Sequence, residues 1–320
     1  MTSTRRIGIA RALIRAGGAA VSGETLAAEL GISRVSVLKH VQALREIGFD
    51  IEAEPGSGYR LLGEPALAVP ETVAPRVTDA FWDAFTGGAE AGSTNDDAKA
   101  AARAGADEGL VVVAASQSAG RGRFGRTWES PSGGAYTSVV LRPAMPPAAV
   151  SPLALVVACG IARGLDALGI RLGIKWPNDL LLDGRKAAGV LLEMSAEADI
   201  VEWVVAGWGL NVRRPPGAPR RAAFLQEAAP ESSPPEAAAL ALDGVAAAYR
   251  RFVSDGFASL VPDFEERDAL RGAHVVVRDL AGRVTAEGEA RGIDDDGRLL
   301  VGGAAVAAGE VTLGSERSGG

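Results

Sequence analysis

The first 65 residues combine apolar positions at helical spacing with a short segment of strand pattern. Apolar side chains recur at three- and four-residue intervals in three stretches, which predicts three amphipathic helices. Ser22 and Ser33 precede the second and third stretches, and serine is a favoured N-cap. Residues 50–54 and 59–62 flank a Pro-Gly-Ser-Gly turn and predict a hairpin. The pattern therefore predicts a winged helix-turn-helix over residues 1–65.

The third of these helices has distinct apolar and polar positions. Its buried positions are expected to be among Val35, Val37, Leu38, Val41 and Leu44. Its outward face is expected to include Arg34, Ser36, Lys39, His40 and Gln42. In a helix-turn-helix protein the corresponding helix can lie in the major groove of DNA.

Longer apolar runs follow, beyond a proline-containing stretch at residues 63–78 that predicts a linker. The expected strands are 109–115, 136–141, 171–175, 180–182, 186–194 and 200–205. Helices are expected to begin near Ser93, Thr94 or Asn95 and to cover 151–168 and 235–257, with a surface loop over 214–236. This mixture of strands and helices predicts a sheet covered by helices.

The pattern changes again near residue 272, where short strands separated by turn residues predict a small SH3-like barrel. Three domains are therefore expected, at residues 1–65, 66–270 and 271–320.

Composition narrows the classes of protein that this chain can be. With 320 residues and 47% apolar content, the chain can form several real cores. A net charge of −7 argues against a general polyanion-binding protein, so any DNA contact must come from a local patch. Two histidines and a single cysteine, Cys159, argue against a histidine-ligated metal site and leave no intrachain disulfide. No apolar run reaches the ~18 residues of a membrane span, and arginines interrupt the first 20 residues, so we expect a cytoplasmic protein without membrane contact.

Three glycines and three arginines alternate over residues 120–126, between two expected strands, and Trp128 follows them. This segment cannot bury an apolar face, and its guanidinium groups repel one another unless an anion lies nearby. The glycines allow a ligand to approach the backbone, and the arginines present planar donors suited to carboxylate or phosphate. Trp128 offers a flat face on which a base can stack. The loop predicts an anion-binding site, although composition alone also fits a solvated basic loop.

Two segments resemble the signature motifs of the biotin protein ligases, in the same order and at a similar separation. The loop Gly120-Arg121-Gly122-Arg123, continued by Gly125-Arg126-Thr127-Trp128 and Ser130-Pro131, is similar to the ligand loop of that family. Lys175-Trp176-Pro177-Asn178-Asp179, followed by Arg185-Lys186 and Gly189 to Glu193, resembles its second motif. Two long motifs are far more specific than one glycine-rich loop. The resemblance implies an α+β multidomain protein, with a class II aminoacyl-tRNA-synthetase-like mixed sheet between the winged helix and the SH3-like barrel.

The resemblance also implies a two-step reaction. Biotin and ATP, with Mg²⁺, would give biotinyl-5'-AMP, and biotin would then pass to a lysine of a biotin carboxyl carrier domain. The biotin-binding residues that it implies are Ser93, Thr94, Asn95, Gln117, Gly120, Arg121, Gly122, Arg123, Lys186, Gly207 and Gly209. The nucleotide-binding residues that it implies are Arg123, Arg126, Trp128, Lys175, Asn178 and Asn211. The catalytic residues that it implies are Lys186, Arg123, Arg121 and Asp179, with no metal-binding residues of the chain itself.

Bifunctional members of the family carry a similar winged helix, which here ends in the matching Pro55 to Tyr59 segment. The resemblance implies that operator DNA contacts Ser33, Arg34, Ser36, Lys39 and His40, and that adenylate binding favours a homodimer. Basic and acidic residues nearly cancel over residues 1–64, so use of the domain for protein contact stays open. Two other functions also stay open: a lipoate ligase of the same fold, and a ligand-sensing repressor with little or no ligase activity.

Overall fold

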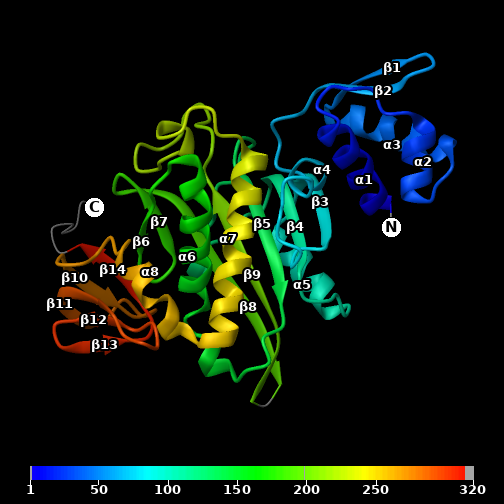
Figure 1. The fold of residues 1–320 in the computed structure, drawn as a ribbon. Helices are drawn as coiled ribbons and strands as arrows, with labels where there is room; N and C mark the ends of the chain where they lie inside the picture. Colours follow the sequence, from blue (N-terminus) through cyan, green and yellow to red (C-terminus); the bar gives the residue numbers. More distant parts are fainter. Residues whose placement is uncertain (1, 198, 314–320) are drawn as a thin grey trace.

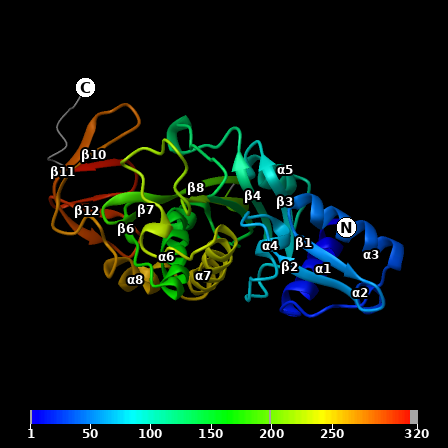
Figure 2. The same ribbon diagram turned by 90° about the horizontal axis from the view of Figure 1, so that it is seen from above.

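The computed structural model describes residues 2–197 and 199–313, which form three parts in a row (Figures 1 and 2). Three helices and a hairpin lie at one end, a seven-stranded sheet with helices lies in the middle, and a five-stranded sheet lies at the other end. The arrangement confirms the multidomain α+β fold expected from the sequence.

The N-terminal part is a winged helix-turn-helix. Its elements are α1 (Thr2–Arg15), α2 (Gly23–Leu30), α3 (Arg34–Ile47), β1 (Asp50–Glu54) and β2 (Gly58–Gly63). Ser22 and Ser33 cap α2 and α3 as expected, because each hydroxyl accepts a hydrogen bond from the backbone N–H three residues later. Gly31 ends α2 in the left-handed conformation (φ 59°), which glycine adopts without strain and which turns the chain toward α3.

The buried positions of α3 are among the five expected apolar residues, but two of the five belong to its outward face, which the sequence did not predict. Val37, Val41 and Leu44 are buried, whereas the side chains of Val35 and Leu38 are 65% and 53% exposed. The buried residues follow one row along the helix, and Val35 lies two residues from that row, roughly 200° around the axis. The outward face of α3 is therefore partly apolar.

The central sheet has the strand order β3-β4-β5-β9-β8-β7-β6. Its strands are β3 (Ala84–Ala91), β4 (Leu110–Gln117), β5 (Ala135–Leu141), β6 (Gly173–Lys175), β7 (Asp179–Leu182), β8 (Arg185–Glu197) and β9 (Ile200–Leu210). β3 and β4 are parallel and every other neighbouring pair is antiparallel, so the sheet is mixed as expected. The sequence pattern did not predict β3, which contains two consecutive glycines.

Helices cover both faces of this sheet (Figure 1). α6 (Leu153–Leu165) and α7 (Pro234–Asp255) pack on one face, and the shorter α5 (Thr94–Arg103) packs on the other. The crossing of α6 and α7 is close, because a Cβ atom at Gly164 would lie 2.0 Å from the carbonyl oxygen of Leu240. Short 3₁₀ helices lie at Arg123–Gly125, Pro147–Val150, Asp166–Leu168, Leu225–Glu227 and Phe257–Leu260.

The apolar character of α6 comes from its place in the core. Residues 147–168 are long and apolar enough to cross a membrane by length and composition only, but 67% of their apolar 18-residue window is buried inside the protein. Cys159 lies on this helix, and burial raises the pKa of its thiol to about 12, so it is an unreactive core residue as expected.

The stretch expected to be a linker is packed. Within residues 63–78, α4 (Pro70–Val73) forms, and Val69, Val73 and Ala74 are fully buried. The carboxylate of Glu71, which is 1% exposed, pairs with Arg6 of α1. Prolines indicated an extended spacer, but the apolar residues between them have enough surface to dock on the central core.

The C-terminal part is a five-stranded antiparallel sheet with the order β13-β12-β11-β10-β14. Its strands are β10 (His274–Arg278), β11 (Val284–Ile293), β12 (Leu299–Val301), β13 (Ala304–Val306) and β14 (Glu310–Leu313). β11 pairs with β10 near its start and with β12 near its end, as expected for a small barrel-like domain. The indole Nε1 of Trp176 donates to the carbonyl oxygen of Gly297 (3.0 Å), which joins this part to the central sheet.

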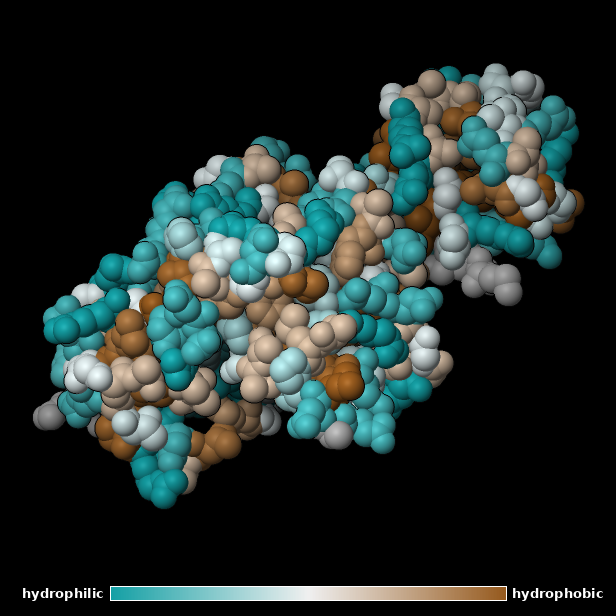
Figure 3. Space-filling model, turned by 60° about the horizontal axis from the view of Figure 1, so that its bottom comes forward, coloured by the Kyte–Doolittle hydropathy of each residue, from teal (hydrophilic) through white to brown (hydrophobic). Residues whose placement is uncertain are grey.

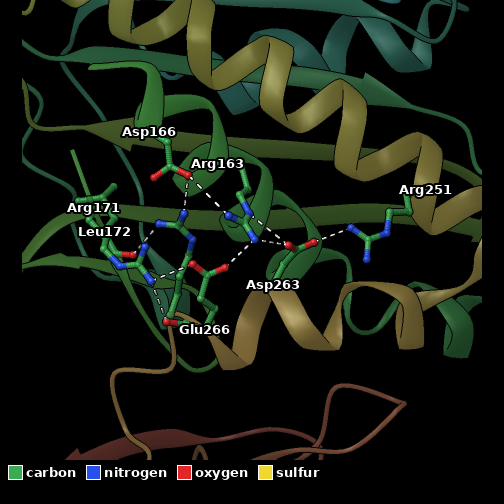
Figure 4. A network of polar contacts seen from close by, with 8 residues as sticks. Arg163, Asp166, Arg171, Leu172, Arg251, Asp263 and Glu266 are labelled. Carbon is green, nitrogen blue, oxygen red and sulfur yellow. Dashed lines mark hydrogen bonds and ion pairs between the residues drawn. The ribbon is translucent and has the colours of Figure 1, made fainter. Parts of the chain in front are cut away.

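An ion-pair network fixes the chain where it leaves the central part through α8 (Val261–Glu265) (Figure 4). Arg163 of α6 and Arg251 of α7 each donate to a different oxygen of Asp263, both at 2.6 Å. Arg267, whose side chain is 1% exposed, pairs with Asp166. Two carboxylates thus link three helices around a buried guanidinium group, which holds the start of the C-terminal part in place.

Candidate active site

A cavity of about 180 Å³ lies on the α5 side of the central sheet. β8 and β9 form its floor, the start of α5 forms one wall, and the loop between β4 and β5 covers it. Glu310 and Val311 of β14 also line it, so the C-terminal part contributes to the cavity. Residues far apart in the sequence therefore share one cavity.

Glycines in β9 let the side chains of Asn95 and Trp128 lie close against the floor of the cavity. A Cβ atom at Gly207 would lie 1.7 Å from Oδ1 of Asn95, and one at Gly209 would lie 2.3 Å from Nε1 of Trp128. Neither position can hold a larger residue without moving its neighbour. Glycine is therefore required at both positions because neighbouring side chains lie close to the strand, and not because the strand needs an unusual backbone conformation there.

The wall at α5 carries a buried polar set. The backbone N–H of Thr94 donates to Oε1 of Gln117 (2.8 Å), and Nε2 of Gln117 donates to Ser130 (2.9 Å). Ser138 of β5 donates to Oδ1 of Asn95 (2.6 Å), which fixes the orientation of that amide. Ser93 occupies the N-cap position of α5, but its hydroxyl makes no capping bond. These hydrogen bonds therefore fix the orientation of the side-chain amides of Asn95 and Gln117.

The glycine–arginine loop folds back on itself. The N–H of Gly122 donates to the carbonyl of Arg126 (2.7 Å), and the N–H of Trp128 donates to the carbonyl of Gly120 (2.9 Å). Phe124 stands at the tip with φ 60°, a conformation that costs a non-glycine residue energy. Backbone strain of this kind is common at ligand-binding loops.

Arg121 contacts two protein carboxylates in this fold. Its Nη2 lies 2.6 Å from Asp96 and 3.1 Å from Glu193, and Lys99 pairs with both acids. Burial opposes the charged form of Glu193, but hydrogen bonds from Lys99 and Asn95 and the charge of Arg121 outweigh it and lower the pKa of that carboxyl. Glu193 is therefore ionised at neutral pH and links the loop to α5.

The other two loop arginines contact different parts of the molecule. Arg123 donates to Oδ1 of Asn178 (3.0 Å) and to the carbonyl of Gly309 (3.2 Å), and desolvation by burial lowers its pKa. Arg126 pairs with Glu310 of β14. The loop therefore bridges the central sheet and the C-terminal part.

Lys186 projects into the cavity from β8. Its Nζ lies 2.6 Å from Oδ1 of Asp179 and 5.0 Å from the ring centre of Trp128. The side chain of Asn178 donates to the carbonyl of Val190 (2.7 Å), which holds the turn before β7 against β8. The basic side chains that line the cavity are Arg121, Arg123, Arg126, Lys175 and Lys186, against two acidic ones, Asp179 and Glu310. The cavity is suited to an anionic ligand.

Comparison with known proteins identifies the family of this chain. Residues 92–211 match the model of the Biotin/lipoate A/B protein ligase family, residues 5–60 match an HTH domain, and residues 272–314 match the Biotin protein ligase C terminal domain. The chain is 35% identical over 315 residues to the Bifunctional ligase/repressor BirA of Bacillus subtilis, covering 94% of this chain and 95% of that protein. This chain belongs to the biotin protein ligase family.

A second relative and a solved structure agree with this membership. The chain is 34% identical to the Bifunctional ligase/repressor BirA of Escherichia coli, covering 88% of this chain and 87% of that protein. The solved structure titled a biotin protein ligase from Aquifex aeolicus in complex with biotin and ATP is 24% identical, with a TM-score of 0.62. It covers 72% of this chain and 98% of that chain, and it shows that the fold is shared.

Most of the residues that the ligase motifs indicated do lie together. Of the biotin, nucleotide and catalytic residues expected from the sequence, all line the cavity except Gly120 and Asn211. Gly120 is buried behind the loop, where its carbonyl accepts from Trp128. Asn211 lies just beyond β9, and its Nδ2 donates to the carbonyl of Lys186 (3.3 Å). These two residues support cavity residues instead of lining the cavity.

Part of the segment 214–236, which was expected to be a surface loop, packs against Lys186 and Asn211. Ala223 and Leu225 are buried, and their N–H groups donate to the carbonyls of Lys186 and Asn211, both at 2.9 Å. Proline and alanine content indicated solvent exposure, but the apolar residues in this segment close over the start of β8.

Sequence reasoning missed three charged residues of the site, namely Lys99, Glu193 and Glu310. Strand alternation could have found Glu193, because it lies on the same face of β8 as Gly189. Lys99 follows Asp96 by one helical turn. Glu310 had no signal, since its contact with Arg126 depends on how the C-terminal part docks.

The expected DNA-contacting residues lie apart from the cavity, on the winged helix. Ser33 and Ser36 are joined by the cap of α3, and Arg34 pairs with Glu24 of α2 (3.0 Å). Partial burial, together with the charges of Arg6 and Arg5, lowers the pKa of His40, so this side chain is neutral near pH 7.

Proposed function

We propose that this protein is an ATP-dependent biotin protein ligase that also represses transcription in response to biotin. The observation that carries the ligase proposal is a single cavity in which a buried hydrogen-bonding set lies beside five basic side chains. A neutral ureido ring needs the first feature, and a carboxylate with a triphosphate needs the second. The relatives named as ligases support the same function.

The biotin end of the cavity would be the polar wall and its glycine floor. Ser93, Thr94, Asn95 and Gln117 present fixed donors and acceptors that match one ureido carbonyl and two N–H groups. Gly207 and Gly209 would support this wall, because they let the side chains of Asn95 and Trp128 lie close against the sheet. This neutral end would hold the ring while the carboxylate reaches the basic side chains.

In the first step a carboxylate oxygen of biotin attacks the α-phosphorus of ATP, and pyrophosphate leaves. Both reactants are anions, so Lys186, Arg121 and Arg123 lower the repulsion and stabilise the charge that develops. Arg126, Lys175 and Asn178 would contact the phosphates, Trp128 would stack on the base, and Asn211 would hold the backbone at Lys186.

Mg²⁺ would enter with ATP as part of the substrate. Among the described residues no group of three or more His, Cys, Asp or Glu side chains could hold a metal ion. The triphosphate oxygens would therefore supply most of its ligands, as is common for this ion.

In the second step the ε-amine of a carrier-domain lysine attacks the acyl carbon of biotinyl-5'-AMP, and AMP leaves. The amine must lose a proton for this attack. Asp179 is the nearest carboxylate to Lys186 (2.6 Å), so it can orient that cation and accept the proton. The carrier domain belongs to a biotin-dependent carboxylase.

The chain would be divided into a DNA-binding domain at residues 1–65, a catalytic domain at residues 66–270 and a C-terminal domain at residues 271–320. The repressor function would use the first of these. Operator DNA would contact Ser33, Arg34, Ser36, Lys39 and His40, and adenylate binding would favour the DNA-binding homodimer. The HTH match over residues 5–60 and the named ligase/repressor relatives support this assignment. A cytoplasmic location would suit all of these partners.

Exchange of labelled pyrophosphate into ATP tests the ligase proposal, with biotin and lipoate in parallel reactions. We expect exchange in the reaction with biotin and none in the reaction with lipoate. Exchange with lipoate would instead favour a lipoate ligase, and silence with both would favour a ligand-sensing repressor that lacks the chemistry.

A further inference from the structure

Two aliphatic side chains stand on the outward face of α3. Val35 and Leu38 are 65% and 53% exposed, and they are the second and fifth residues of the helix. Residues three apart on a helix lie on the same face. The two side chains therefore form one small apolar patch at the N-terminal half of α3, which is named the Val35–Leu38 patch below.

The surroundings of this patch match DNA better than another protein surface. α3 carries three basic residues, Arg34, Lys39 and Arg45, and one acid, Glu46. Arg34 and Lys39 directly adjoin the patch in the sequence, and both are exposed. Figure 3 shows hydrophobic as well as hydrophilic residues at the surface of this N-terminal part. An apolar spot between cations suits a ligand that is anionic at its edges and has methyl groups between them.

The major groove of DNA has this chemistry. Phosphates line its rims, and the C5-methyl group of thymine is the only apolar group on the base edges inside it. In helix-turn-helix proteins the N-terminal residues of the second helix of the motif contact the base edges. Positions 35 and 38 occupy that part of α3.

We propose that Val35 and Leu38 select DNA sites by packing against thymine methyl groups, with Arg34 and Lys39 contacting the flanking phosphates. This inference rests on the proposed repressor function and names the bases that the repressor reads. The N-terminal part has eight basic and seven acidic residues over positions 1–64, so charge alone gives little attraction to DNA. Burial of thymine methyl groups would then supply a large share of the difference in binding free energy between DNA sites.

The test begins with selection of duplexes from a random pool by the full-length protein in the presence of biotin and Mg-ATP. Each thymine of the selected duplex is then replaced by uracil, which removes one methyl group and leaves the base pair intact. We expect weaker binding at two or more thymines per half-site, by about fourfold for each methyl that packs fully, which corresponds to about 0.8 kcal/mol.

Variants link this loss to the patch. Leu38→Ala and Val35→Ala should each abolish the uracil effect at one set of positions, while Leu280→Ala should leave it unchanged. Leu280 is a matched control because it is a 79% exposed leucine in the C-terminal part. Thermal melting of each variant verifies that the exposed truncations leave the fold intact.

The outcomes separate the inference from the function on which it rests. If no duplex is enriched, the repressor proposal itself fails, and the thymine contact fails with it. If a duplex is enriched but uracil has no effect, or has the same effect in Leu38→Ala and Val35→Ala as in the parent protein, DNA binding stands and the methyl contact is wrong.

Discussion

The catalytic cavity and the outward face of α3 handle charge in different ways. In the cavity, all three loop arginines contact acceptors of the protein, and five basic side chains face two acidic ones. On α3 the ligand-facing surface combines two basic residues with two exposed aliphatic ones. A small anion is bound by charges that are ordered before it arrives, whereas a duplex can be discriminated by shape and methyl groups.

Removing a cavity cation should produce the largest effect. We expect Lys186→Ala to reduce biotin-dependent pyrophosphate exchange by about 10²-fold or more, because one fixed donor to the developing charge is lost. Asp179 would also lose its cation partner, at 2.6 Å. Near-normal exchange by a folded variant would remove Lys186 from its proposed role. Lys39→Ala, which removes a lysine from the winged helix, is the control and should leave exchange unchanged.

Filling the cavity floor should have the next largest effect. We expect Gly207→Ala to raise KM for biotin by more than tenfold, because the added Cβ would lie 1.7 Å from Oδ1 of Asn95. A shift of that amide would disturb the whole polar wall, and small displacements at a site are costly. Gly88→Ala in β3 is the matched control, since its Cβ would meet no atom within 4 Å. Equal KM values for the two variants would contradict the proposed biotin position.

Loss of Glu193, a carboxylate that pairs with the cavity residue Arg121 without itself lining the cavity, should have a smaller effect. Glu193→Gln keeps the size of the side chain but removes the charge that holds Arg121 and Lys99. We expect KM for biotin to rise about threefold to tenfold, as for a lost charged hydrogen bond, with a smaller change in kcat. Glu197→Gln, on the same strand and exposed, is the control. A loss confined to kcat would contradict a role in positioning the wall.

The same substitution should alter the dependence of stability on pH. The pKa of Glu193 is lowered in the folded protein from its usual 4.5, so the stabilisation it gives is present above that value. It is lost as the pH falls through the folded pKa. Urea unfolding at a series of acidic pH values should therefore show a shallower loss of stability in Glu193→Gln than in the parent protein. Parallel curves would contradict the assignment.

The comparison also explains what the sequence could predict. Motif spacing was sufficient to bring Lys186, Asn178 and the glycine–arginine loop together, because each lies at the end of a recognisable strand. Periodicity was not sufficient to show that Val35 and Leu38 are exposed. An apolar residue that faces a ligand gives the same hydrophobic pattern in the sequence as an apolar residue that faces the core. The contact of Arg126 with Glu310 depends on docking of the C-terminal part, which local patterns do not encode.

The smallest expected effect lies on the winged helix. There, removal of a protein carboxylate should strengthen ligand binding, whereas at the cavity it should weaken it. Arg34 pairs with Glu24 while both side chains are more than 70% exposed, so this ion pair competes weakly with a phosphate. We expect Glu24→Gln to release Arg34 and to tighten binding of the selected duplex about twofold to threefold, the range of a surface ion pair. A released arginine that gains one phosphate contact should also steepen the slope of log K against log salt by about 0.9.

Glu29→Gln is the matched control for that experiment, because it makes the same charge change on α2 at another exposed position. If both variants tighten binding equally, the gain comes from net charge and Arg34 has no specific contact. If only Glu24→Gln does so, the ion pair limits the affinity of the winged helix for DNA. Internal carboxylates would then restrain the outward face of α3, whereas in the cavity the same kind of pairing orders the site for its ligand.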